Sequence, residues 1–319
     1  IADLANDPTY GGNTDNAFTQ KMGKRQGQYY VPQRAEAGLD PWATPQAYDN
    51  AKDFFDTGIT WSNSLNVAQM LDKSSYSISL GNTHQDGIIS STGMDRYNVK
   101  VSADTKLTNN WSSGFTANYI TTSIDKAVTS GNGLLRTVYA APPSYDLAGI
   151  PSHVDGNQYT QNSFRGSFDN AYWAMDNNKF TEDTNRFFGN VYASYQTDFG
   201  TTNHKLNAKY MVGVDAYTTH YVDSYGYGSN TGGGRGQIEN YGWTNATYNS
   251  LLTINYDWHI NEDWGLNAVL GNEIIQSNRK KYYEYGTNYN FPGWNHINNA
   301  TTQQTEEETW KNRTVGFFG

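Results

Sequence analysis

The chain has 319 residues, a formal net charge of −9 and a mean hydropathy of −0.76. The acidic balance and the lack of a basic cluster argue against nucleic acid as a partner. No run of about 18 apolar residues is present to form a transmembrane helix. Aromatic residues make up 15% of the chain, whereas disordered segments are poor in aromatics. We therefore expect a folded chain whose apolar residues follow a pattern other than long runs.

The first 59 residues are rich in Gly, Asn, Gln and Pro and show little hydrophobic periodicity. We predict one short helix here, with Thr44 at the N-cap, Pro45 at the first helical position and Gly58 at the end. Three residues would share one face of this helix: Tyr48, Ala51 and Phe55. We interpret residues 1–61 as a long loop that carries this helix.

From residue 62 onward, apolar and polar residues alternate along the chain. In residues 187–197 the odd positions include Val191 and Tyr195, and the even positions include Asn190 and Ser194. A period of two predicts strands with one apolar and one polar face. Nine strands are predicted, at about residues 62–71, 74–85, 95–105, 111–122, 185–197, 204–220, 248–258, 264–276 and 309–319.

The connections between these strands alternate in length. The short ones are Asp72–Lys73, Lys106–Asn110, Asp198–Asn203 and His259–Asp263. The longer ones are Asp86–Met94, Ser123–Thr184, Tyr221–Thr247 and Ser277–Glu308. Short turns at one end and long loops at the other are typical of outer-membrane barrels. We therefore predict an all-β fold: a segment of a large antiparallel transmembrane β-barrel with short periplasmic turns and long extracellular loops.

Aromatic residues gather near the short turns. Trp and Tyr prefer a membrane–water interface, because the ring is apolar and the NH or OH group is polar. The predicted interface girdle consists of Trp111, Tyr195, Phe199, Trp258 and Trp264. The alternative is that these residues form the core of a soluble sheet, and the charges on the opposite face of the strands do not decide between the two.

Five segments stand in a fixed order along the second part of the loop and the strands. They are KDFFDTGITWSNSLNV (Lys52–Val67), SYSISLGNTHQDGII (Ser75–Ile89), RYNVKVSADTKLTNNW (Arg96–Trp111), YAAPPSYDLAG (Tyr139–Gly149) and DNAYWAMDNNKFTEDTNRFFGNVYASY (Asp169–Tyr195). Their order and spacing resemble the SusC/RagA-type TonB-dependent transporters of the Bacteroidetes outer membrane. The resemblance implies a large plugged barrel, the class with about 22 strands. It also implies import of glycans or peptides, a SusD-like surface lipoprotein as lid, and energy from the TonB complex.

The chain departs from that family in what it lacks. We find no plug domain, no TonB box and no second half of a barrel, and the chain does not begin with Met. We therefore expect a partial chain from the middle of the barrel. Its expected organisation is an extracellular loop with one short helix at residues 1–61 and a barrel segment of about nine strands at residues 62–319.

No catalytic or metal-binding constellation stands out. The six histidines have no metal-ligand spacing, and we expect neither a metal nor a cofactor. The longest loop carries the carboxylates Asp169, Asp176, Glu182 and Asp183, whereas a glycosidase needs two carboxylates on either side of the scissile bond. Sequence alone does not show such a pair, and we predict that the chain is not an enzyme.

The loop Ser123–Thr184 is the expected functional element. Its aromatic rings, with amide and carboxylate neighbours, suit sugar rings or peptide backbones. The candidate ligand-binding or lid-contact residues are Tyr139, Tyr145, Tyr172, Trp173, Asp176 and Asn178. The alternative is that the aromatics pack the loop on itself or against a lid. A similar set is expected in the last long loop: Tyr282, Tyr283, Tyr285, Tyr289 and Trp294.

Three functions remain open at this point. The leading one is part of an outer-membrane importer, which predicts contact with the lipid bilayer. The second is a secreted β-rich carbohydrate-binding or hydrolytic domain, and the third is a surface adhesin without transport. Dependence on detergent separates the first from the second, and a plug with a TonB box in the complete gene separates the first from the third.

Overall fold

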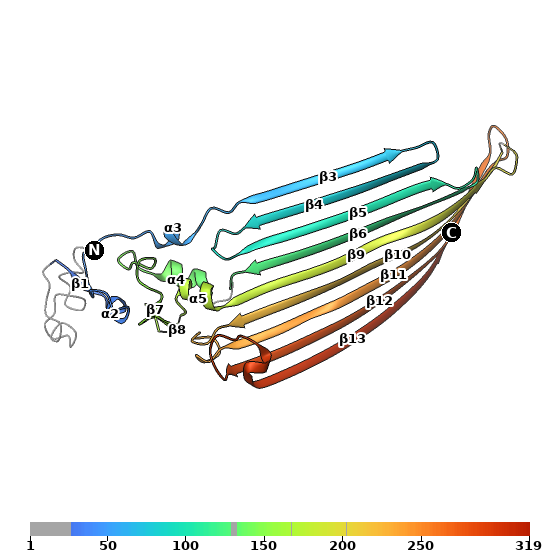
Figure 1. The fold of residues 1–319 in the computed structure, drawn as a ribbon. Helices are drawn as coiled ribbons and strands as arrows, with labels where there is room; N and C mark the ends of the chain where they lie inside the picture. Colours follow the sequence, from blue (N-terminus) through green and yellow to red (C-terminus); the bar gives the residue numbers. More distant parts are fainter. Residues whose placement is uncertain (1–26, 129–132, 167, 202) are drawn as a thin grey trace.

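One antiparallel sheet of nine strands dominates the computed structural model, which describes residues 27–128, 133–166, 168–201 and 203–319 (Figure 1). The strands are β3 (Thr60–Met70), β4 (Ser74–Asp86), β5 (Gly93–Lys106), β6 (Trp111–Lys126), β9 (Lys179–Thr197), β10 (His204–Tyr225), β11 (Gln237–His259), β12 (Gly265–Tyr289) and β13 (Ala300–Phe318). Within the sheet each strand pairs with the strands before and after it, in the order β13-β12-β11-β10-β9-β6-β5-β4-β3. The predicted all-β class and the nine strands are confirmed.

The sheet keeps a constant register from β3 to β13. No pair of its strands shows a register shift. Side chains alternate between the two faces at every residue. Without a register shift, every second residue of a strand therefore stays on the same face along the whole strand. One face, here the apolar face, collects Leu80, Val99, Phe115, Val191, Val212, Ile254, Leu270 and Val315. The other, the polar face, collects Lys100, Asp104, Arg186, Lys209 and Asp215.

No second layer formed by the described residues covers the apolar face (Figure 1). Among the described residues, every buried hydrophobic side chain lies outside its apolar stretch, in the loops, in the segment before β3 or at the outer ends of β11 to β13. On β11 the apolar stretch runs from Tyr248 to Trp258, about 33 Å at about 3.3 Å per residue. A strand tilt of about 40° reduces this to a height of roughly 25 Å, the height of the apolar band in outer-membrane barrels.

The strands continue well past the apolar stretch, so three connections are shorter than predicted. The connection expected at Asp86–Met94 is residues 87–92, the one expected at Tyr221–Thr247 is residues 226–236, and the one expected at Ser277–Glu308 is residues 290–299. Beyond the apolar band each face mixes polar residues with a few apolar ones such as Val222 and Ile238, so the hydrophobic alternation stops while the backbone pairing continues. The last connection contains the 3-10 helix η2 (Ile297–Asn299).

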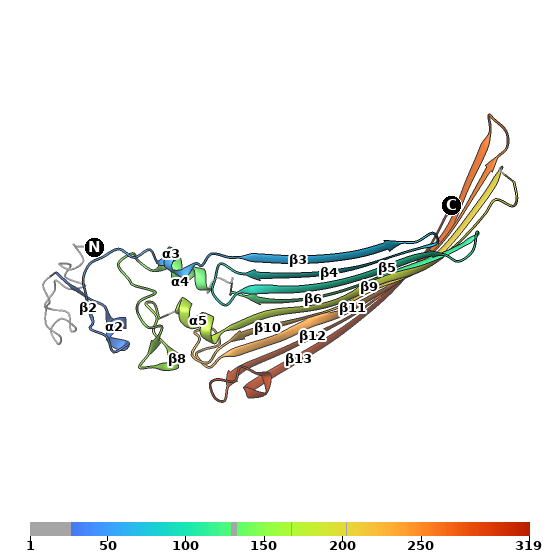
Figure 2. The same ribbon diagram turned by 45° about the horizontal axis from the view of Figure 1, so that its top comes forward.

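The longest connection and the segment before β3 are folded, and both lie at the end of the sheet opposite the short turns (Figures 1 and 2). The segment before β3 contains β1 (Tyr29–Tyr30), α2 (Pro32–Glu36), β2 (Trp42–Ala43) and α3 (Asn50–Phe54). The connection between β6 and β9 contains α4 (Leu134–Ala140), β7 (His153–Val154), β8 (Asn157–Gln161) and α5 (Ala171–Asn177). We call the described parts of residues 27–59 and 127–178 the cap.

The predicted helix near residue 50 exists, but its start and its end were predicted wrongly. Helix α3 begins after Asp49, whose carboxylate accepts a hydrogen bond from the Lys52 amide at 3.1 Å. Thr44 and Pro45 precede the helix and belong to no helix or strand. The backbone there is held elsewhere, because the Tyr48 amide donates to the Pro143 carbonyl at 2.8 Å. Residues 1–26 of the predicted loop lie outside the described residues.

Among the described residues, no helix is both long enough and apolar enough to cross a lipid bilayer.

Candidate functional site

A hydrophobic core joins the two segments of the cap. It combines Tyr29, Val31 and Phe54 from the segment before β3 with Leu134, Val138, Tyr145, Leu147, Ile150, Ala171, Trp173 and Ala174 from the long connection. Helices α3, α4 and α5 meet in this core. Apolar burial of this kind stabilises a folded unit in water, so the long connection is a small globular structure at one end of the sheet.

Hydrogen bonds tie the same two segments together. The Asn50 side chain accepts from the Leu147 amide at 3.1 Å and donates to the Pro142 carbonyl at 3.3 Å. The Asn162 side chain donates to the Gln33 carbonyl at 2.8 Å. Since Asn50 and Asn162 are both buried, these bonds satisfy polar groups that water does not reach, and they set how the segments lie against each other.

Two of the six candidate residues of the loop, Trp173 and Tyr145, are inside the cap. The side chain of Trp173 is 1% exposed, and its indole N–H donates to the Gln158 carbonyl at 2.8 Å. Tyr145 is 7% exposed, and its hydroxyl has no hydrogen-bond partner among the described residues. Burial raises the pKa of this hydroxyl well above its ordinary value. For these two rings, the arrangement favours the alternative in which the loop packs on itself.

Of two other candidates, Tyr139 is exposed on the cap and Tyr172 is half-buried at the edge of its core. Tyr139 is 68% exposed, and its ring centroid lies 6.2 Å from that of Phe55. Tyr172 packs edge-on against Phe54 at 5.3 Å, and its hydroxyl donates to the Asp53 carbonyl at 3.2 Å. Both rings therefore contact the segment around α3, and Tyr139 presents most of its surface to the surroundings.

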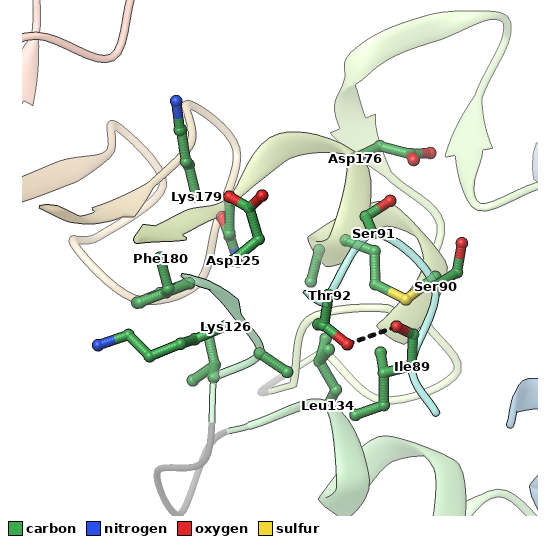
Figure 3. Close-up of a pocket in the computed structure, with 15 residues that line it drawn as sticks. Ile89, Ser90, Ser91, Thr92, Asp125, Lys126, Leu134, Asp176, Lys179 and Phe180 are labelled. Atoms are coloured by element: carbon green, nitrogen blue, oxygen red, sulfur yellow. Dashed lines mark hydrogen bonds between the residues drawn. The ribbon is translucent and has the colours of Figure 1, made fainter. Parts of the chain in front are cut away.

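The last two candidates, Asp176 and Asn178, line a cavity where the cap meets the sheet (Figure 3). The cavity measures about 450 Å³ and lies between the end of α5, the ends of β6 and β9, and the connection at residues 87–92. Thr92 is held in place by a hydrogen bond from its hydroxyl to the Ile89 carbonyl at 2.6 Å. The Asn178 side chain accepts from the Gly226 amide at 2.8 Å, which links the wall of the cavity to the next connection.

The cavity carries both signs of charge. Its lining residues include Asp125, Asp176, Lys126 and Lys179. The ammonium of Lys126 lies 3.5 Å from the Glu182 carboxylate and 4.6 Å from the centre of the Tyr221 ring. In Figure 3 the two lysines lie on the opposite side of the cavity from Asp176. Such a lining can bind a polar ligand that carries both donors and acceptors.

The other carboxylates of the loop are dispersed. Asp169 is 9% exposed and accepts hydrogen bonds from Gln161 at 2.7 Å, Ser229 at 2.5 Å and the Asn230 amide at 2.7 Å. It therefore fastens the cap to the connection at residues 226–236. Glu182 and Asp183 are consecutive residues of β9, so they point to opposite faces of the sheet. The geometry does not bring these groups together as a catalytic pair.

A row of tyrosines crosses the polar face above the apolar band. Tyr221, Tyr241 and Tyr283 are register partners on β10, β11 and β12. The rings of Tyr221 and Tyr241 stack at 4.8 Å, and that of Tyr283 lies 6.4 Å from Tyr241. The Tyr241 hydroxyl donates to Asp223 at 3.0 Å. This row could have been found from the sequence by continuing the two-residue period of each strand past the point where apolar and polar residues stop alternating.

The tyrosines expected in the last long loop therefore lie in a strand. Tyr282, Tyr283, Tyr285 and Tyr289 belong to β12, and only Trp294 of that set is in the connection. Tyr282 and Tyr283 are consecutive, so they lie on opposite faces of the sheet. The predicted set does not act as one aromatic surface.

The five girdle candidates all lie at the end of the sheet with the short turns. Trp111 and Tyr195 are register partners whose rings are 5.0 Å apart. Trp258 ends the apolar face of β11, and Trp264 follows across the turn at residues 260–264 with 70% of its surface exposed. Phe199 lies in the turn between β9 and β10. Contact of these rings with lipid stays a prediction.

Comparison with known proteins finds similarity at the level of structure. No family model matches the sequence, and no curated protein matches it. Solved structures of the RagAB peptide importer do match. The closed-closed state superposes with a TM-score of 0.69 and 16% identity over 85% of this chain, and the open-open state with 0.72 and 15% over 99%. A further structure, of the RagAB peptide transporter, gives 0.70 and 14% over 85%.

The chain spans about a third of the chains that it matches, 31% in two cases and 36% in the third. At this level of identity the likeness shows the fold. The nine-stranded sheet therefore has the fold of a segment of the matched RagAB chains, in agreement with the resemblance to SusC/RagA-type transporters that the sequence suggested. The three structures named above are of a peptide importer or peptide transporter.

Proposed function

We propose that this chain is part of a TonB-dependent active transporter of the bacterial outer membrane that imports oligopeptides or oligosaccharides. The observation that carries the proposal is the uncovered apolar face, whose height of roughly 25 Å suits the hydrocarbon layer. A soluble sheet of nine strands would bury one face against a second layer. The likeness to the RagAB peptide importer supports transport and supports peptides as one substrate class.

The orientation follows from the lengths of the connections. Short turns in bacterial barrels face the periplasm and long loops face the outside. The turns at residues 71–73, 107–110, 198–203 and 260–264 are therefore periplasmic, and the cap is extracellular. The described part of residues 1–61 then precedes the barrel segment on the outer side, and residues 62–319 contain the membrane-spanning strands. The polar face lines the interior of the barrel, and the girdle residues lie at the periplasmic interface.

The cap is the part of this chain that contacts a SusD-like surface lipoprotein or the incoming ligand. Tyr139, Tyr172, Asp176 and Asn178 are the contact residues, because they are accessible on the cap or line its cavity. Tyr145 and Trp173 act by holding the cap together. Energy comes from the TonB complex through a plug outside this chain. No step requires a catalytic residue, a cofactor or a metal.

The test uses the complete transporter in its native host. Uptake of labelled oligopeptides and oligosaccharides is measured in wild type, in a strain lacking the gene, and in a strain complemented with Tyr139→Ala/Asp176→Ala, with Leu135→Ala as the surface control on the same cap. We expect uptake to be lost without the gene and lowered in the double variant, together with co-purification of the lipoprotein. Unchanged uptake of both substrate classes without the gene would contradict the proposal.

A further inference from the structure

One arginine on the polar face is held between two tryptophans. The guanidinium carbon of Arg279 on β12 lies 5.2 Å from the ring centre of Trp243 on β11 and 5.6 Å from that of Trp310 on β13. Trp310 is the register partner of Arg279, and Trp243 is the partner of Lys281, the next residue on the same face. Three adjacent strands thus place the guanidinium between two indoles.

Arg279 has no carboxylate within ion-pair distance and no hydrogen bond among the described residues. Arg186, on the same face, shows the usual alternative. It makes a two-pronged pair with Asp215, with N–O distances of 2.9 and 2.6 Å. Contact with aromatic rings uses the flat face of a guanidinium and leaves its N–H donors at the edge available. Among the described residues, the donors of the Arg279 guanidinium are therefore left free for a ligand.

Near Arg279 on the polar face, the other cation of β12 has an acidic residue opposite it, whereas Arg279 does not. Lys281 faces Glu308 directly across β12 and β13, so the charges of these two residues offset each other. The next pair outward is Tyr283 and Glu306. A guanidinium with free edge donors binds a carboxylate through two parallel hydrogen bonds, and the two indoles offer apolar surface to the carbon atoms next to that carboxylate.

The position of Arg279 along the strands suits a ligand that enters the barrel from the end that carries the cap. Tyr221, Tyr241 and Tyr283 form a row two residues further out along the strands than Trp243. Arg279 lies two residues further in than Lys281, above the apolar stretch that begins at Tyr248 on β11. A ligand moving inward along the polar face would pass the tyrosines and then meet the cation.

We propose that Arg279, Trp243 and Trp310 form a subsite that binds a carboxylate of the transported ligand. This inference rests on the proposed function and narrows its substrates to molecules that carry a carboxylate. Two sources share that chemistry: the terminal or side-chain carboxylate of a peptide, and the carboxylate of an acidic sugar.

The test measures binding to the purified complete transporter with its lipoprotein. One pair of probes is a hexapeptide library with free C-termini and the same library amidated. The other is a trigalacturonate and its methyl ester. We expect the wild type to prefer the free acid in at least one pair, and the pair that shows the preference identifies the source. Arg279→Gln should remove that preference with a loss of roughly 10- to 100-fold for the acid, the size expected for a charged hydrogen bond.

Two further variants separate recognition from structure. Arg279→Lys keeps the charge but loses the two-pronged geometry, and should retain part of the preference. Arg313→Gln removes an arginine of β13 whose guanidinium donates to Gln276 at 3.0 Å on the opposite face, and should leave the preference unchanged. Equal loss for acid and neutral forms in Arg279→Gln, or no preference in the wild type, overturns the subsite. Continued uptake of neutral substrates would leave the proposed transport function standing.

Discussion

The cap and the sheet place the same kinds of residue in opposite environments. In the cap, Trp173 is 1% exposed and lies among apolar side chains, as expected for a structure folded in water. In the sheet, Trp264 is 70% exposed, and the apolar face has no covering layer among the described residues. Within a single chain, large apolar side chains are therefore buried in the cap and exposed on the apolar face of the sheet. The difference is what the proposed function expects, with water around the cap and lipid along the apolar face of the strands.

The largest expected effect comes from opening the core of the cap. Trp173→Ala removes a fully buried indole and its hydrogen bond to Gln158, which should lower the stability of the cap by about 3–5 kcal/mol. Hydrogen exchange of the complete transporter should show a loss of amide protection in α4 and α5 and no change in β9 to β12. Tyr139→Ala, at an exposed ring of the same cap, is the control and should leave protection within about 0.5 kcal/mol of wild type. Equal effects of both variants would mean that the cap is not a cooperatively packed unit.

The next prediction tests whether the exposed apolar face of the sheet contacts lipid. Val212→Arg places a charge in the middle of the apolar band of β10 and should cost roughly 2–4 kcal/mol if that face contacts lipid. Lys209→Arg, on the polar face of the same strand, should be tolerated. The measurement is the amount of each variant assembled in outer membranes, judged by heat-modifiable mobility on gels. Similar amounts of both variants would contradict the assignment of the two faces.

The smallest effect concerns an unpaired hydroxyl inside the cap. Tyr145→Phe removes a buried hydroxyl that has no partner among the described residues, so the variant should be as stable as wild type or more stable by about 1 kcal/mol. Burial raises the pKa of this hydroxyl, so the folded cap disfavours its ionised form. The wild type should therefore lose stability relative to the variant as the pH rises above about 10, the ordinary pKa of tyrosine.

The stability of the cap is measured for the wild type and for Tyr145→Phe at pH 8 and pH 10.5. Its thermal unfolding is monitored by hydrogen exchange or by limited proteolysis. The difference between variant and wild type isolates Tyr145 from the other tyrosines of the cap. A variant that is less stable than wild type at both values would show that the hydroxyl has a partner.

The sequence by itself determined the strands and their faces. A side-chain period of two is a local property, so residues such as Val191 and Asn190 could be assigned to opposite faces before any partner strand was known. The same alternation, with the short turns, predicted nine antiparallel strands in chain order. The hydrophobic alternation covered only part of β10 to β12, because beyond the apolar band polar and apolar residues are mixed on each face while the backbone pairing continues.

The tertiary structure decided what depends on residues far apart in the chain. Trp173 is buried because the segment around Phe54 packs against α5, and the two residues are more than a hundred positions apart, where a local pattern carries no signal. Helix α3 begins at Asn50, after the N-cap Asp49, and the residue before that cap, Tyr48, donates its amide to the carbonyl of the distant Pro143. The cation between two indoles exists only because three strands bring Trp243, Arg279 and Trp310 together. Side-chain type and spacing set the face on which each residue lies, and register between strands sets the neighbours that it meets.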